Sequence, residues 1–115
     1  MSTTEGVQII LHHVTDLAAA KAVYTALLGI EPAQDAPYYV GYEAAGQQIG
    51  LVPNGGPQGM TSPVAYWRVA DIEAKLAELT AVGATIHEAA HDVGGGRLVA
   101  TIKDPDGNVL GVFQD

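Results

Sequence analysis

The sequence predicts a single α+β domain in which two tandem βαβββ modules form a curved mixed sheet around a concave pocket, with the helices outside. Three observations support this prediction. A chain of 115 residues suits one domain with its own core. Two strand-like runs are each followed by an amphipathic helix pattern. These patterns repeat, because Val14 and Val69 are 55 positions apart, and so are Asp16 and Asp71.

The first module is predicted to contain one helix, over residues 17–28. Asp16 offers an N-cap for it, and Gly29 is a natural C-terminal stop. Pro32 and Pro37 then interrupt regular structure. Strands are predicted where β-favouring, largely apolar residues run together, at residues 7–14, 38–42 and 47–52.

The second module repeats this order after a linker rich in turn-forming residues. Its helix is predicted over residues 72–82, between the N-cap Asp71 and the stop Gly83. Residues 104–107 form a Pro- and Gly-containing turn between the last two strands. The predicted strands are residues 64–69, 85–87, 97–103 and 108–114. The single domain, residues 1–115, thus divides into module 1 at about 6–53, a linker at 54–62 and module 2 at about 63–115.

Composition excludes several classes of function. Five Lys and Arg stand against thirteen Asp and Glu, a net charge of −8, so we expect neither nucleic acid nor a membrane as partner. The chain has no Cys, which excludes disulfides and thiolate metal sites. It also shows neither a signal peptide nor an apolar run of the ~20 residues that a membrane span needs. We therefore expect a cytoplasmic protein.

Each predicted module carries residues that match a known family. In the first they are Val14-Thr15-Asp16-Leu17, Tyr24, Leu27-Leu28-Gly29 and Pro32. In the second they are Val69-Ala70-Asp71-Ile72-Glu73-Ala74, Gly83-Ala84 and Asp104-Pro105-Asp106-Gly107-Asn108. This pattern resembles the vicinal oxygen chelate superfamily, which contains glyoxalase I, bleomycin resistance proteins, extradiol dioxygenases and fosfomycin-resistance enzymes. The resemblance covers essentially the whole chain and implies the fold, but the superfamily hosts many chemistries.

The resemblance also implies where a metal would bind. Metal-dependent members place His or Glu ligands on the first, fourth, fifth and last strands, and these positions correspond here to Ile9, Gly50, Val64 and Gly111. None of the four side chains can coordinate a divalent ion. We therefore expect no metal and no other cofactor, as in a metal-free, glyoxalase-like branch. The two glycines are expected to leave extra room in the pocket.

Alternation along the strands predicts which residues line the pocket. Residues two apart share a face of a strand, so His13 accompanies Ile9 while His12 points toward the helix layer. In the same way, residues two or four positions from Gly50, Val64 and Gly111 are expected to share the pocket face of their strands. With Tyr39 as a flanking residue, the predicted ligand-binding residues are His13, Gln48, Tyr39, Tyr66, Arg68 and Phe113.

Each of these polar side chains also has an ordinary structural explanation. His13 is the candidate general base, but a histidine at a strand end often bonds a backbone carbonyl. Arg68, with Tyr66, suits a carboxylate or an aromatic plane, but it can instead pair with one of the many acids. Tyr39 is equally explained by β-propensity.

Two further patterns suggest sites and are set aside. His87 and His91 would lie about 13 Å apart on a strand, at about 3.3 Å per residue, too far to share a metal. Residues 94–96 are three glycines that precede a strand rather than a helix, so they are expected to lead into that strand and not to bind phosphate.

Two hypotheses for function remain. The first is a metal-independent, glyoxalase-like protein that binds a small organic molecule, as bleomycin resistance proteins do. Its acidity favours cationic or basic ligands, and the expected ligand is cationic or aromatic. The alternative is a metal-independent enzyme of isomerase- or lyase-like proton transfer, with His13 as general base and Tyr66 or Arg68 stabilising negative charge. The resemblance also implies a homodimer.

Overall fold

The computed structural model describes residues 3–54 and 62–115 and confirms the α+β class, with the order βαβββ occurring twice. Contacts divide the chain into two compact units. The N-terminal unit is Gln8–Val64, and the C-terminal unit combines Ala65–Asp115 with the segment Met1–Val7. The concave pocket stays a prediction.

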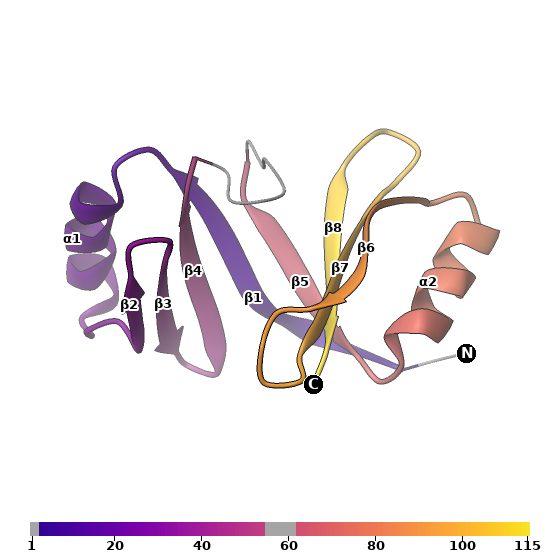
Figure 1. Cartoon of the computed structure of the whole chain (residues 1–115), viewed down its shortest axis with the longest axis horizontal. Helices are drawn as coiled ribbons and strands as arrows, with labels where there is room; N and C mark the ends of the chain where they lie inside the picture. The colour runs from indigo at the N-terminus through magenta and orange to yellow at the C-terminus, as the bar shows by residue number, and fades with distance from the viewer. Residues whose placement is uncertain (1–2, 55–61) are drawn as a thin grey trace. The chain divides into compact units, whose positions relative to one another are not determined.

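The N-terminal unit consists of one helix on four strands (Figure 1). Its elements are β1 (Thr4–Val14, from Gln8 onward), α1 (Leu17–Leu28), β2 (Gln34–Ala36), β3 (Tyr39–Ala44) and β4 (Gln47–Pro53). The strand order is β2-β3-β4-β1; β1 and β4 are parallel and the other pairs antiparallel. Val40, Tyr42 and Leu51 form the buried core, against which the apolar side of α1 packs.

The ends of α1 form as the sequence predicts. Asp16 accepts a hydrogen bond from the Ala19 N–H at 3.0 Å, and Gly29, at φ 72°, donates to the Thr25 carbonyl. The short strand β2 was not predicted. Pro32 and Pro37 flank it and confine it to three residues at the edge of the unit.

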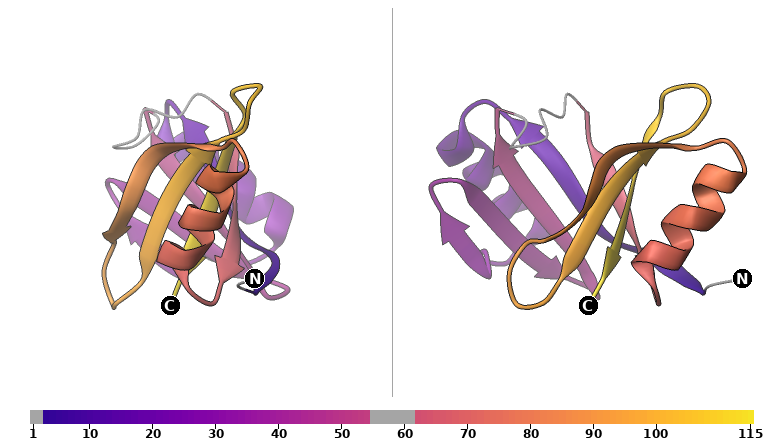
Figure 2. Two further views of the ribbon diagram at one scale, coloured as in Figure 1. Left: turned by 90° about the vertical axis from the view of Figure 1, so that its right-hand side faces the viewer. Right: turned by 45° about the vertical axis from the view of Figure 1, so that its right-hand side comes forward.

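The C-terminal unit repeats this plan (Figure 2). Its elements are β5 (Val64–Val69), α2 (Ile72–Ala81), β6 (Thr85–Asp92), β7 (Leu98–Lys103) and β8 (Val109–Gln114). The strand order is β5-β8-β7-β6, with β5 and β8 parallel. The core under α2 is Val69, Ile72, Leu76, Ala100, Ile102 and Val112. The Thr3 carbonyl accepts a hydrogen bond from the Ala70 N–H, which ties the N-terminal segment to the end of β5.

The predicted cap and turn of the second module are confirmed. Asp71 accepts a hydrogen bond from the Ala74 N–H at the start of α2. Between β7 and β8, the Asp104 carboxylate accepts hydrogen bonds from the backbone N–H of Asp106 and of Asn108 and from the Asn108 side chain. These bonds, the Asn108 side chain first, lower the pKa of Asp104. Its carboxylate therefore holds the turn.

Within residues 3–54 and 62–115, neither helix has the length and apolar character required to cross a lipid bilayer.

Candidate functional site

In each unit one face of the strands packs against the helix, and the opposite face, here called the distal face, carries most of the predicted site. On β1 the His12 ring lies on the helix side, 5.3 Å from the Tyr24 ring centroid, as predicted. Burial there lowers the pKa of His12. Alternation then assigns Leu11 and His13 to the distal face. In the described part of the N-terminal unit this face includes Leu11, His13, Tyr39, Gly41, Gln48 and Gly50.

The Tyr39 ring covers the two distal-face glycines of the N-terminal unit. A Cβ atom added at Gly50 would lie 2.6 Å from the Tyr39 hydroxyl and 2.5 Å from Leu11 Cδ2, and one at Gly41 would lie 2.8 Å from Tyr39 Cε2. The expectation that Gly50 leaves extra room is therefore wrong. The absent side chain allows an aromatic ring to lie directly on the strand, and that ring fills the space.

The C-terminal unit has the same arrangement at Gly111. This glycine lies in register with Tyr66 on the neighbouring strand. A Cβ atom at Gly111 would lie 2.5 Å from Tyr66 Cδ2 and 2.6 Å from its Cγ, so the ring packs flat on the glycine. Tyr66 is only 3% exposed. The extra room expected at Gly111 is thus also filled.

The metal of the metal-dependent members does not fit these residues. Ile9, Gly50, Val64 and Gly111 offer no donor atom, and at both glycines a tyrosine ring occupies the place into which a side chain would extend. No group of three or more His, Cys, Asp or Glu residues in the described chain is arranged to hold a metal. No chemistry is therefore assigned to a metal.

His13 lies at the end of β1, in register with Val52 of β4. Its Nδ1 atom is buried and makes no hydrogen bond with any residue of the described segments, so the carbonyl bond considered from the sequence is not formed there. His13 also borders an open depression of about 410 Å³ at the start of α1, which Asp16 and Val23 help to line. Gln48 lies near the start of β4, in register with Ile9.

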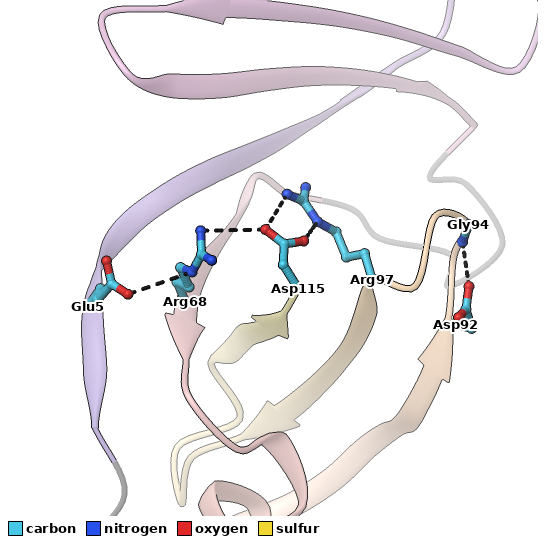
Figure 3. Close-up of polar contacts among 6 residues, drawn as sticks. All are labelled: Glu5, Arg68, Asp92, Gly94, Arg97 and Asp115. Carbon is cyan, nitrogen blue, oxygen red and sulfur yellow. Dashed lines mark hydrogen bonds and ion pairs between the residues drawn. The ribbon is translucent and has the colours of Figure 1, made fainter.

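Arg68 pairs with acids, the ordinary explanation considered above (Figure 3). Its Nε lies 3.6 Å from Glu5 Oε2, and its Nη1 lies 3.5 Å from Asp115 Oδ2. Phe113, in register with Arg68 on β8, is 1% exposed. The Arg97 guanidinium lies 4.7 Å from the centroid of its ring. Any role of Arg68 and Phe113 in binding a ligand stays a prediction.

Arg97 belongs to this site and was missed from the sequence. Its Nε and Nη2 donate to the two oxygens of Asp115, at 2.5 and 3.0 Å. The hydrogen bond from Arg97 is the main reason why the pKa of Asp115 is lowered. Strand alternation could have identified Arg97. Val99 pairs with Phe113, and Arg97 lies two residues before Val99, so all three share one face of the sheet.

The histidines of β6 have local partners. Irregularities in the β6–β7 pairing, between Ile86 and Glu88 and between Glu88 and His91, break the simple alternation assumed for the spacing of His87 and His91. His87 Nδ1 lies 3.0 Å from Thr101 Oγ1, whereas His91 Nδ1 lies 2.8 Å from the Ala89 carbonyl. Each imidazole therefore has a local structural role in the β6–β7 pair.

The three glycines before β7 form the turn from β6. All three have positive φ, and the Val93 N–H donates to the Arg97 carbonyl across the turn. Asp92 accepts a hydrogen bond from the Gly94 N–H at 2.6 Å. The turn thus leads into β7 as expected and places Arg97 at the start of that strand.

Comparison with known proteins identifies relatives of this fold. Residues 7–112 match the family model of the Glyoxalase/Bleomycin resistance protein/Dioxygenase superfamily. No curated protein matches the sequence significantly.

Three solved structures illustrate the likeness. Methylmalonyl-CoA epimerase from Mycobacterium tuberculosis is 18% identical with a TM-score of 0.76, over 96% of this chain and 88% of that one. The Mn(II)-bound glyoxalase from Novosphingobium aromaticivorans is 20% identical with a TM-score of 0.77, over 100% of this chain and 40% of that one. A superfamily member from Vibrio splendidus 12B01 is 17% identical with a TM-score of 0.69, over the full length of both chains. At these identities the likeness shows the fold alone.

Proposed function

The chain belongs to the glyoxalase/bleomycin resistance protein/dioxygenase superfamily, and we propose that within it the protein is a metal-independent binder of a small organic molecule. The observation that carries this proposal is the packing of Tyr39 on Gly50 and of Tyr66 on Gly111. By the resemblance, metal-dependent members have Glu ligands at these two glycine positions, which aromatic rings cover here. The partly exposed Tyr39 ring suits an organic ligand held by apolar contact and a few polar groups.

The remaining features of the proposal follow from composition and family. The net charge of −8 favours a cationic ligand through its long-range field, and the Tyr39 ring favours an aromatic one through contact. By resemblance to bleomycin resistance proteins, the protein acts as a homodimer. Its acidic composition further favours a cytoplasmic protein with neither nucleic acid nor membrane as partner.

A ligand screen with paired tyrosine variants tests the proposal. A thermal-shift screen of aromatic and amphipathic compounds should give hits that raise the melting temperature. Tyr39→Ala should weaken the best hit by about tenfold or more, because the ring presents contact area on the distal face; that loss corresponds to about 1.4 kcal/mol. The neighbouring Tyr38, 76% exposed and outside β3, supplies the matched control Tyr38→Ala, which should leave binding unchanged. A screen without hits, or equal losses in both variants, would contradict the proposal.

One observation favours the alternative function, proton transfer by His13. A buried imidazole nitrogen that makes no hydrogen bond with the described residues is not committed to a structural partner there. A general base must also lie within reach of its substrate, and His13 borders the open depression at the start of α1. His13 therefore remains the candidate base of an isomerase- or lyase-like member.

Proton exchange into the screened ligands tests this alternative. For hits with an acidic C–H bond, the protein should catalyse exchange of that hydrogen with deuterium from D₂O. His13→Ala should slow the exchange by about 100-fold, the usual minimum for a general base, with the affinity nearly unchanged. The control His91→Ala removes an imidazole bonded within its own strand and should have no effect. Equal exchange rates for the wild-type protein and His13→Ala would remove His13 from the mechanism.

A further inference from the structure

Both arginines of the chain converge on one carboxylate in the C-terminal unit (Figure 3). Arg97 binds both oxygens of Asp115 through Nε and Nη2, and Arg68 Nη1 lies 3.5 Å from Oδ2. The paired contact of Arg97 is the geometry in which a guanidinium recognises a carboxylate most specifically. In a chain with only five basic residues, two of them thus lie beside one carboxylate.

The two guanidinium groups are held in place independently of Asp115. Arg97 follows the glycine turn, whose backbone bonds fix its position, and its guanidinium lies over the buried ring of Phe113. Arg68 extends from β5, in register with Phe113. Its Nε also lies 3.6 Å from Glu5 Oε2. Arg97 is thus pre-organised to receive a carboxylate, and Arg68 adds a second positive charge beside it.

Asp115, in contrast, is held loosely by the backbone. The ladder between β7 and β8 ends with the pair Leu98 and Gln114, so Asp115 follows the last paired residue of its strand. Its side chain is 37% exposed. A ligand carboxylate can form the same paired contact with Arg97, so exchanging it for the Asp115 side chain keeps the ion pair.

We propose that Arg68 and Arg97 form a binding site for a small organic carboxylate, and that the ligand displaces the Asp115 side chain. The inference rests on the proposed function, because it names the chemical class of the ligand. Direct contact with the two arginines outweighs the acidic field of the whole chain, which salt screens beyond about 8–10 Å. Asp115 then acts as an internal competitor, so the site responds only to ligands with contacts beyond the carboxylate.

Benzoate and its neutral analogue benzamide are suitable probes, followed by NMR titration of the full chain. Asp115→Asn removes the competing charge, so it should bind benzoate about tenfold or more tightly than the wild-type protein. Benzamide should bind both proteins equally. Adding Arg97→Gln to Asp115→Asn should abolish the gain. Asp115→Ala also removes the competing carboxylate and should show the same gain in affinity, so it replaces Asp115→Asn if the asparagine variant does not fold.

Asp106→Asn is the matched control, because it removes one exposed carboxylate from the same unit, away from both arginines and from the glycine turn. The inference predicts that Asp106→Asn binds benzoate as the wild-type protein does. Equal gains in Asp106→Asn and Asp115→Asn would reduce the effect to net charge and overturn it. Absence of benzoate binding in every variant would also overturn it. The proposed function would stand or fall separately, on the Tyr39→Ala screen, which involves neither arginine.

Discussion

Gly111→Glu is expected to destabilise the protein strongly and to gain no metal, although it restores the residue type of the metal-dependent members. The added Cβ alone would lie 2.5 Å from the Tyr66 ring, closer than atoms in contact allow. Overpacking of this kind costs about 1–3 kcal/mol, which is the loss expected for Gly111→Ala. The glutamate adds the cost of an unpaired carboxylate at a buried position. Its free energy of unfolding should therefore fall below that of the alanine variant.

The backbone at Gly111 is not itself the reason for this loss. Gly111 is not among the residues of positive φ, so an alanine can adopt its conformation without strain. The overlap with Tyr66 is the physical cause. Consequently Tyr66→Ala and Gly111→Ala should not be additive: in the double variant the new methyl group enters space that the ring has vacated.

Urea unfolding of paired glycine variants measures these effects. Gly6 is exposed, has no atom within 4 Å of an added Cβ and is also free of positive φ. Gly6→Ala and Gly6→Glu should therefore change the free energy of unfolding by less than about 0.5 kcal/mol. Unfolding of Gly111→Glu in Mn²⁺ and in EDTA should be the same. Equal stability of the Gly6 and Gly111 variants, or stabilisation by Mn²⁺, would contradict the prediction. Either result would show that the Tyr66 ring moves away to accommodate a side chain at position 111.

Much of the fold was predictable because its signals are local. Asp16 and Asp71 cap helices through hydrogen bonds to residues three positions later, and Asp104 closes its own turn. Such contacts depend only on neighbours in the sequence. The same logic failed for β2, whose three residues between two prolines carry too few alternating positions to distinguish a strand from a loop.

The candidate site was predictable only as far as strand alternation reaches. Alternation placed His12 against α1 correctly, and it would have identified Arg97 had it been extended to β7, where Val99 pairs with Phe113. It does not give side-chain conformation. Whether a glycine leaves space or receives the ring of Tyr39 or Tyr66 depends on a rotamer of a neighbouring residue, and spacing carries no information about that.

Tyr42→Ala is expected to have the largest effect on stability, because this side chain joins β3 to α1. Tyr42 is completely buried in the core of the N-terminal unit. Its hydroxyl donates to the Lys21 carbonyl at 3.0 Å, so the Thr25 hydroxyl, 2.8 Å away, donates to it. Replacement of a buried aromatic ring by alanine costs about 3–5 kcal/mol. The loss is a large fraction of the roughly 5–15 kcal/mol by which domains are stable.

Tyr42→Phe separates the hydroxyl from the ring. It keeps the packing but leaves the Thr25 hydroxyl without this partner, which should cost about 1–2 kcal/mol in urea unfolding. The exposed Tyr38 provides matched controls, since Tyr38→Phe and Tyr38→Ala should each change stability by less than about 0.5 kcal/mol. Thr25→Ala should add little to Tyr42→Phe, because the two residues share one hydrogen bond. If Tyr42→Phe unfolds no more readily than Tyr38→Phe, the hydroxyl does not fasten α1 to the sheet.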